Sequence, residues 1–346
     1  MQLEAGDDLT FGGSLSATTS PTLVVLRAVG GDLSFTGRVN ASRAGSEVQL
    51  AAGGDATLHG SLRQLDHIDV DAGGAADLAG SVTPRESLTV EAGGAVTLDA
   101  SIRALGADLA LRGAAGVTVK KPIYLTPLFA LGGSLELTSA AGSVATEKSI
   151  RSLDVTIAAG SDILVGAVLS ANAPARSGGA IRMTSGGDVI VSDRLRAQSG
   201  DGTQPGDGAG GRIEIDAAGL VQITADVLVT AFPGHEGAPG GTFDVEAGRI
   251  VLSDVHFDAD GDTPGPDFPG SLPAGFQLRS TVGEISLQGV FRAHGGPSVL
   301  EAAAATNLTA VGEFDAAPDG CIALAAGGTV DASGAEFDPA FVSDCP

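Results

Sequence analysis

Aromatic residues are scarce in this sequence. Its 346 residues include 12 Phe, one Tyr and no Trp. Sites that hold sugars usually present the faces of aromatic rings, so this scarcity disfavours a sugar-stacking cleft. Two cysteines are present, Cys321 and Cys345, and both lie near the end of the sequence.

Segments that would interact with a membrane or an export machinery are also lacking. No run of about 18 uninterrupted apolar residues occurs, which argues against a transmembrane helix and direct membrane insertion. Residues 1–8 have neither a basic region nor an apolar segment, so we expect that no signal peptide opens this chain.

Positively charged residues are also scarce. Lys and Arg number 19 against 42 Asp and Glu, and the formal net charge is −23. Proteins that bind nucleic acids without sequence preference neutralise phosphates with Lys and Arg. We therefore expect no nucleic-acid partner.

Glycine is abundant, with 52 residues, but it does not occur at every third position, which excludes collagen. Hydrophobic residues make up 43% of the chain, which argues against simple disorder. Much of the glycine belongs to a repeat. Ala-Gly-Gly triplets begin at Ala52, Ala72 and Ala92, a constant interval of about 20 residues. Further Gly-Gly pairs follow along the chain at intervals of about 30 residues in the second half.

Apolar residues alternate on both sides of these pairs in short runs, which is the periodicity of β-strands. The sequence predicts an all-β fold, a right-handed single-stranded parallel β-helix of about 12–15 turns stacked at the inter-strand distance. Glycine at the corners would permit backbone conformations that other residues resist. An antiparallel sandwich is the alternative, but none of the three Asn residues precedes Gly as a hairpin would favour.

We predict one solenoid domain over residues 1–346. Regular turns of about 20 residues would cover 20–120, and longer turns of about 30 residues with loop insertions would cover 172–310. The end of the solenoid, 318–346, would be capped by a disulfide. The predicted insertions are 172–178, 200–211, 233–240 and 258–275.

The copies Gly210–Ala217, with the pattern Gly-Gly-x-Ile-x-Ile-x-Ala, and the Ala-Gly-Gly-x-Val-x-Leu copies resemble those of secreted bacterial right-handed β-helix proteins. This pectin-lyase-like group includes filamentous-haemagglutinin-like adhesins. The resemblance implies export and a role at the bacterial surface or outside the cell. It names no substrate, because one fold supports many functions.

A disulfide between Cys321 and Cys345 would fasten the tail across the last turn. Closing a loop of about 25 residues contributes roughly 3–4 kcal/mol in the chain-entropy model. Two free thiols and a redox pair are the alternatives, although a Cys-x-x-Cys spacing is lacking. A disulfide would place the protein in an oxidising compartment.

The densest acidic segment contains Asp258, Asp260 and Asp262, which alternate around Gly261. Calcium prefers several carboxylate oxygens on a bending loop, so these residues form a candidate calcium site. A solvated acidic loop is the alternative. No other cofactor is predicted.

A polysaccharide lyase or glycoside hydrolase is the enzymatic alternative, because such enzymes place carboxylates in a groove on one face. No spacing pairs the candidate acids, which are Asp226, Asp244, Asp254 and Asp258. A loose basic stretch could hold an acidic sugar or be an ordinary solvated face; it consists of Arg176, Arg182, Arg194, Arg196 and Arg212.

Other signals are weaker. The Gly/Asp-rich loop 200–211 lacks the order of calcium-binding nonapeptides and the Gly-Lys-Ser/Thr of a phosphate loop. The histidines have no compact metal-ligand spacing, and threonines do not recur as a flat ice-binding face would need.

The function predicted from the sequence is therefore a non-enzymatic, secreted or cell-surface β-helix with a structural or adhesive role. It would present loops to an extracellular protein or polysaccharide partner.

Overall fold

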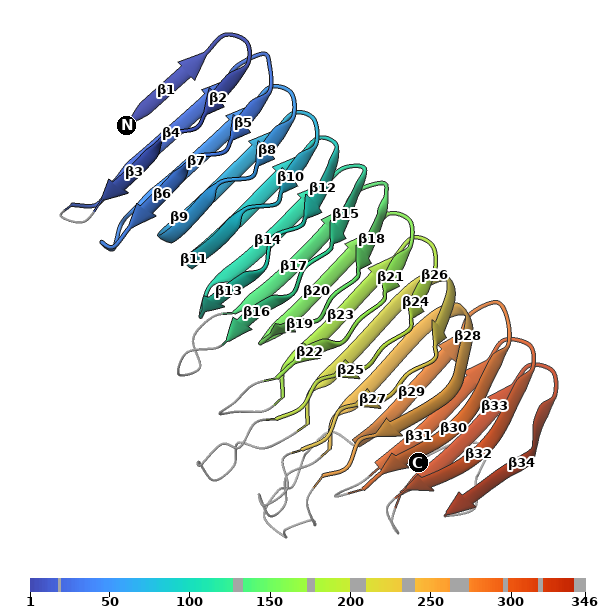
Figure 1. Cartoon of the computed structure of the whole chain (residues 1–346). Helices are drawn as coiled ribbons and strands as arrows, with labels where there is room; N and C mark the ends of the chain where they lie inside the picture. The colour runs from blue at the N-terminus through green and yellow to red at the C-terminus, as the bar shows by residue number, and fades with distance from the viewer. Residues whose placement is uncertain are drawn as a thin grey trace. The chain divides into compact units, whose positions relative to one another are not determined.

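The computed structural model describes residues 1–17, 20–126, 133–172, 178–199, 210–231, 240–261, 274–294, 298–316 and 320–338. The chain divides into two compact units, unit 1 (Met1–Ser161) and unit 2 (Asp162–Pro346). Both units consist of short parallel β-strands stacked turn upon turn (Figure 1). The fold is an all-β parallel β-solenoid of about 12 turns, as the repeat predicts. No membrane-spanning helix is found among the described residues.

Each turn of unit 1 contributes three strand segments, and each segment pairs only with its equivalents in neighbouring turns. The segments thus form three parallel stacks. The first stack contains β1 (Gln2–Ala5), β4 (Leu23–Ala28), β7 (Glu47–Ala52), the second halves of β9 (Ser61–Ala72) and β11 (Ser81–Ala92), β14 (Asp108–Gly113), β17 (Ser134–Ser139) and β20 (Asp154–Ala159). The second contains β2 (Leu9–Phe11), β5 (Leu33–Phe35), β8 (Ala56–Leu58), β10 (Ala76–Leu78), β12 (Ala95–Leu98), β15 (Gly116–Val119) and β18 (Ser143–Thr146). The third contains β3 (Ser14–Ala17), β6 (Arg38–Ala41), the first halves of β9 and β11, β13 (Ile102–Leu105), β16 (Ile123–Thr126) and β19 (Ile150–Ser152).

Unit 2 repeats the three-stack arrangement with several strands that run continuously around a corner. Its first stack contains β23 (Ala180–Ser185), the starts of β26 (Arg212–Ile223) and β28 (Thr242–Asp258), β29 (Ala274–Ser280), β31 (Ser298–Ala304) and β33 (Cys321–Ala326). Its second contains β21 (Ile163–Val165), β24 (Val189–Val191), the end of β26, the middle of β28 and the starts of β30 (Ile285–Ala293), β32 (Leu308–Ala316) and β34 (Val330–Asp338). Its third contains β22 (Leu169–Ala171), β25 (Leu195–Arg196), β27 (Val227–Leu228) and the ends of β28, β30, β32 and β34.

The sequence repeat corresponds to one turn of the solenoid. In unit 1, Ala52 pairs with Ala72 and Ala72 pairs with Ala92, so each Ala-Gly-Gly triplet lies beside the triplet of the previous turn. In unit 2 the turns are longer, since Ala217 pairs with Ala247, as the wider spacing in the second half predicts. Later turns shorten again, because Ala304 pairs with Ala326. The predicted hand of the solenoid and the single domain over 1–346 stay predictions.

Glycine occupies the Gly-Gly corners for a different physical reason from the expected one. Among the described residues seven glycines have a left-handed φ, and the repeat glycines Gly53, Gly73 and Gly93 are not among them. Their backbones instead approach the turn below so closely that a Cβ on Gly73 would overlap the carbonyl oxygen of Gly53. The same overlap would occur between Gly93 and Gly73. Glycine at this corner therefore serves close stacking of turns rather than an unusual backbone conformation.

Acidic side chains accept backbone hydrogen bonds at this corner. Asp8 Oδ1 accepts a hydrogen bond from the backbone N–H of Asp32 at 2.9 Å, and Asp32 Oδ1 accepts one from Asp55 at 2.8 Å. Asp55 Oδ1 in turn accepts the N–H of Ala75 at 2.7 Å. Each carboxylate satisfies a backbone donor of the next turn, so part of the acidic excess is structural.

The interior consists of aliphatic columns, with one departure from expectation. A column of the first stack in unit 1 is almost fully buried and consists of Val24, Val48, Ile68, Leu88, Leu109, Leu135 and Val155. The scarcity of aromatics suggests a core of small aliphatics alone. This expectation is wrong, because Phe35 is fully buried in unit 1 and several phenylalanines are buried in unit 2. There a chain of ring contacts runs through the interior, formed by Phe243, Phe257, Phe276, Phe291, Phe314 and Phe337.

Candidate functional site

The predicted calcium ligands lie at the end of β28 and beyond it. The Asp258 carboxylate accepts the N–H of Asp260 at 2.9 Å, and the Asp260 carboxylate contacts Nδ1 of His294 at 2.8 Å. Asp262 lies outside the described residues. Among the residues that the structure describes, no group of three or more potential ligands is arranged to hold a metal ion. The calcium site stays a prediction.

His294 joins two carboxylates across neighbouring turns. Its Nε2 lies 3.0 Å from Asp315, opposite the contact of Nδ1 with Asp260. Burial lowers the pKa of His294, but the hydrogen bonds and charges of Asp315 and Asp260 outweigh it, so the pKa is raised. The imidazole therefore favours its charged form and links three successive turns of unit 2.

The predicted basic stretch is largely neutralised by acids. Arg182 forms an ion pair with Glu214 at 2.9 Å, and Arg194 forms one with Asp226 at 2.5 Å. Arg212 contacts Glu214 and Asp244, Arg196 ends β25, and Arg176 lies outside the described residues. Arg182, Arg194 and Arg212 thus join neighbouring turns through ion pairs, and a role in holding an acidic sugar stays a prediction. Of the remaining candidate acids, Asp254 lies within β28 with a left-handed φ of 56°.

Unit 2 does bring acids together in one groove on the first stack. This acidic groove has a volume of about 590 Å³, and its charged lining consists of Arg182, Glu214, Asp216, Asp244, Glu246 and Arg279. Glu214 pairs in register with Asp244, and Asp216 pairs with Glu246, so carboxylates face each other across one turn. Burial raises the pKa of Asp244, although Arg212 partly offsets it. Among the acids of this lining only Asp244 was a candidate from the sequence, and Arg182 belongs to the predicted basic stretch.

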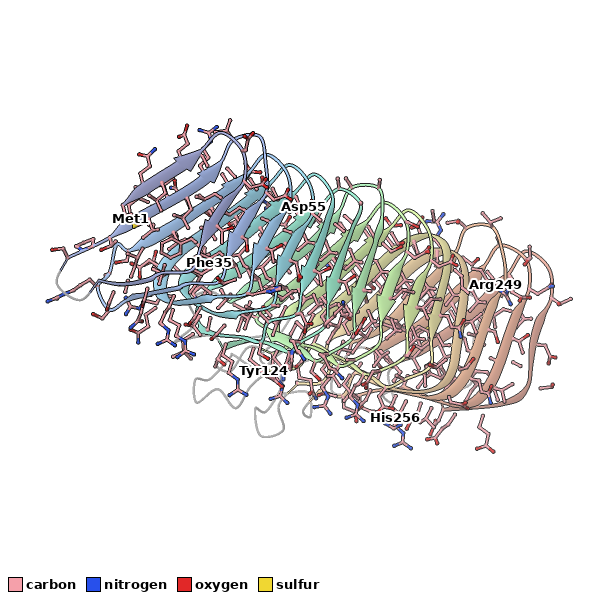
Figure 2. All side chains as sticks on the ribbon, turned by 45° about the horizontal axis from the view of Figure 1, so that its top comes forward. Met1, Phe35, Asp55, Tyr124, Arg249 and His256 are labelled. Atoms are coloured by element: carbon pink, nitrogen blue, oxygen red, sulfur yellow. The ribbon has the colours of Figure 1, made fainter. Side chains whose placement is uncertain are left out.

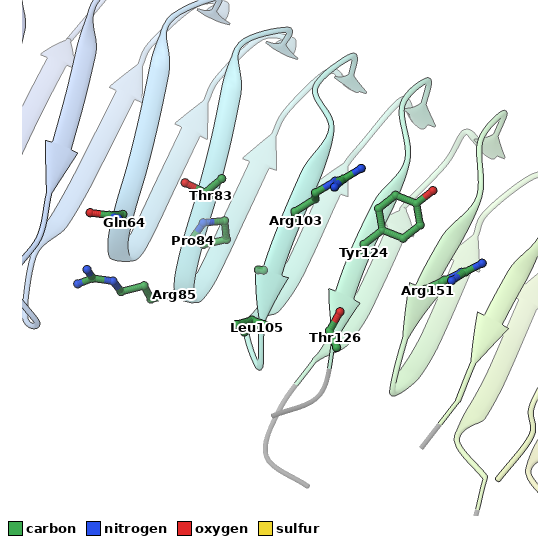
Figure 3. Close-up of a pocket in the computed structure, with 10 residues that line it drawn as sticks. Gln64, Thr83, Pro84, Arg85, Arg103, Leu105, Tyr124, Thr126 and Arg151 are labelled. Carbon is green, nitrogen blue, oxygen red and sulfur yellow. The ribbon is translucent and has the colours of Figure 1, made fainter. Parts of the chain in front are cut away.

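A second groove, on the third stack of unit 1, was not predicted from the sequence. It has a volume of about 610 Å³, and we call it the Arg–Tyr groove; its lining consists of Gln64, Thr83, Pro84, Arg85, Arg103, Ala104, Leu105, Tyr124, Thr126 and Arg151. This described lining contains three arginines and no acidic residue, on a chain with a net charge of −23. Figure 3 shows the lining side chains on successive strands.

The centre of the groove is the one tyrosine of the chain. Arg103 pairs in register with Tyr124, and Tyr124 pairs with Arg151, so the three outward side chains lie in successive turns. The guanidinium carbon of Arg103 lies 5.4 Å from the ring centroid, and that of Arg151 lies 5.7 Å from it. Cation–π attraction on both sides holds the two arginines in place. In Figure 2, Tyr124 lies along the lower edge of the turns and Asp55 along the upper edge.

Two further residues shape one end of the groove. Gln64 has a left-handed φ of 58°, and the register between β9 and β11 shifts beside it, at Pro84. Arg85 lies 3.5 Å from Asp66, whose side chain is 6% exposed. Arg85 is thus held by its ion pair with Asp66, whereas Arg103 and Arg151 are exposed.

The alignment of Arg103, Tyr124 and Arg151 leaves only a weak signal in the sequence. Each follows an isoleucine that opens a strand, at Ile102, Ile123 and Ile150. The interval from Tyr124 to Arg151 is longer than that from Arg103 to Tyr124, so the three do not stand out as a repeat.

Cys321 is the first residue of β33, and Cys345 lies outside the described residues, so the disulfide stays a prediction. Compared with family models, with curated proteins and with solved structures, the chain gives no match in any of the three. What the structure shows of the resemblance to bacterial β-helix proteins is the β-solenoid fold.

Proposed function

We propose that this chain is a non-enzymatic, secreted or cell-surface β-solenoid that binds an extracellular partner along the third stack of unit 1. The observation that carries this proposal is the Arg–Tyr groove, in which two exposed arginines are held on either side of Tyr124. The resemblance of the repeats to filamentous-haemagglutinin-like adhesins, whose β-helix is right-handed, supports the location.

A solenoid suits this task because it repeats an outward position at about 4.8 Å from turn to turn. Side chains of different turns therefore form a straight row on a stiff support, and a long partner can contact several of them at once. The row Arg103, Tyr124 and Arg151 is such an arrangement.

The predicted insertions all occur at the same point of their turns. The predicted loops 172–178, 200–211, 233–240 and 258–275 each connect a third-stack strand to the next first-stack strand. Most of their residues lie outside the described part of the chain. Along the sequence, these segments thus follow the third-stack strands of unit 2, and we infer that they present loops to a partner from that unit.

The proposal is tested by incubating the purified chain with immobilised polysaccharides and matrix proteins and by measuring both retention and release of soluble fragments. We expect retention on at least one anionic partner without release of fragments. Turnover of any polysaccharide would overturn the non-enzymatic role, and absence of retention on every partner would overturn the binding role.

A second candidate is a glycoside hydrolase or lyase that uses the acidic groove. Glycoside hydrolysis needs one protonated and one ionised carboxyl group across the scissile bond. Asp244, with its raised pKa, and its acidic neighbours Glu246 and Asp216 line the same groove. If this candidate is right, release of reducing ends is lost in Asp244→Asn and retained in Arg103→Gln.

A further inference from the structure

The outward positions of the third stack in unit 1 alternate in a regular way. Arg63 pairs with Thr83, and the pairing of the preceding residues Val82 and Ile102 places Arg103 beside Thr83 in the next turn. Tyr124 and Arg151 follow at the same position. Arginine therefore recurs at every second turn, with a neutral residue between. No carboxylate occurs at this position from Asn40 to Arg151.

This alternation sets a distance between positive charges. Adjacent parallel strands lie about 4.8 Å apart, so positions two turns apart lie about 9.6 Å apart along the stack. Tyr124 keeps Arg103 and Arg151 on opposite sides of its ring, at 5.4 and 5.7 Å from the centroid. The ring thereby separates two like charges and fixes both of them.

We propose that the Arg–Tyr groove binds a linear anionic glycan that carries a carboxylate or a sulfate on every second sugar and lies parallel to the stacking direction. This inference rests on the proposed function. Two sugars of an extended chain cover about the same length as two turns, so successive anionic groups meet Arg103 and Arg151. Guanidinium groups bind carboxylates and sulfates through charge-assisted hydrogen bonds.

The rest of the lining suits the neutral sugars of such a chain. Thr83, Thr126 and Gln64 offer hydroxyl and amide groups for sugar hydroxyls. Leu105, which is 61% exposed, offers an apolar contact for the C–H face of a sugar ring. Figure 3 shows Leu105 and Thr126 side by side below Arg103 and Tyr124.

The charge of the chain disfavours denser polyanions. Nucleic acids carry one phosphate per strand at about every 3.4 Å of helix axis, which is far closer than the arginine spacing. The net charge of −23 would repel the phosphates that find no arginine. A glycan with one charge per two sugars places its charges where the arginines are and few elsewhere.

The experiment is a calorimetric titration of the full chain at low salt with size-defined oligosaccharides. The carboxylate arm is an alternating glucuronate oligosaccharide, and the sulfate arm is an alternating oligosaccharide with sulfate as its only charge. The comparison probes are an oligogalacturonate with a carboxylate on every sugar and a neutral oligosaccharide. The variants are the double variant Arg103→Gln with Arg151→Gln, the variant Tyr124→Leu, and Arg27→Gln as the matched control on the exposed first stack.

We expect one of the alternating oligosaccharides to bind more tightly than both comparison probes. The double variant should lose about tenfold in affinity, since each exposed charge-assisted contact contributes up to about 1 kcal/mol and two are removed. Tyr124→Leu should weaken binding by several-fold while circular dichroism stays unchanged, and Arg27→Gln should bind as the unmodified chain does.

Equal binding of the oligogalacturonate, or an affinity of the double variant within twofold of the unmodified chain, would overturn the inference. Either result would leave the proposed function standing if the chain is still retained on another partner. A DNA oligonucleotide is titrated in the same way, and its tight binding in place of the oligosaccharides would also overturn the inference.

Discussion

Residues at the corner between the first and second stacks decide how closely successive turns approach. Gly53, Gly73 and Gly93 lie one above the other there, and the N–H of Gly73 donates to the carbonyl of Ala52 at 2.9 Å. The hydrogen bond and the close approach depend on the missing side chain, because a Cβ would meet the backbone of the neighbouring turn. The distance between successive turns therefore depends on these single glycine residues.

We expect Gly73→Ala to destabilise the protein by about 2 kcal/mol, because the added Cβ would overlap the Gly53 carbonyl of the neighbouring turn and overpacking costs about 1–3 kcal/mol. Gly6→Ala is the matched control in the same unit, because a Cβ on Gly6 would meet no atom within 4 Å. Urea unfolding followed by circular dichroism measures both. Equal midpoints for the two variants would contradict the stacking argument.

Elements of unit 2 are held together by interactions that cross from turn to turn. The rings of Phe291 in β30 and Phe314 in β32 stack with centroids 4.8 Å apart, and Phe314 stacks on Phe337 in β34 at 5.2 Å. Phe291 and Phe314 are fully buried. The last turns therefore depend on a continuous aromatic column as well as on the backbone ladder.

Phe291→Ala should cost about 3–5 kcal/mol, the usual loss for a buried phenylalanine, and it should reduce the unfolding midpoint in urea. Phe11→Ala is the comparison, because Phe11 stacks on Phe35 at 5.6 Å but is only half-buried in the first turn. We expect the smaller loss there. A larger loss for Phe11→Ala would show that the column is unimportant.

The contact of His294 with Asp260 and Asp315 makes stability depend on pH. The folded pKa of His294 is raised above its ordinary value of about 6.5, so the contact stabilises fully below that pH. The stabilisation is lost as the pH rises through the folded pKa. Other charged groups lie at the same end of the third stack as His294. They are Asp258, His256, Arg292 and Glu313.

The difference in stability between the unmodified chain and His294→Gln should therefore shrink as the pH rises above about 6.5. Because the pair is partly exposed, the whole effect should stay below about 1 kcal/mol. Urea unfolding at a series of pH values measures it. A difference that grows with pH would contradict the assigned direction.

At the scale of the whole molecule, the negative charge is organised rather than uniform. Aspartates such as Asp32 and Asp55 hold corner N–H groups, and ion pairs such as Arg112 with Glu136 at 2.8 Å join neighbouring turns. The Arg112 guanidinium lowers the pKa of Glu136 despite partial burial. Against this background the acid-free lining of the Arg–Tyr groove is the exception, and it marks the face on which we expect the partner.

Calcium binding at Asp258, Asp260 and Asp262 would add a further local charge effect. If the prediction is right, calcium should raise the melting temperature more than sodium chloride at equal ionic strength, and Asp260→Asn with Asp262→Asn should remove that difference. Equal shifts with both salts would dispose of the site.

The sequence predicts the solenoid well because one sequence repeat corresponds to one turn of the fold. Ala52, Ala72 and Ala92 recur at the interval at which the chain returns to the same stack. The two grooves could not be predicted in this way. Arg103, Tyr124 and Arg151 come together only once the unequal lengths of two turns are known, and the phenylalanine column likewise joins residues at irregular intervals.

The most direct test of the proposed binding face is amide hydrogen exchange of the unmodified chain with and without the alternating anionic oligosaccharide. We predict slower exchange in the third-stack parts of the groove strands β9, β11, β13, β16 and β19, with the second stack of unit 1 unchanged. Protection confined to the acidic groove of unit 2, or to segments away from the third stack, would contradict the account.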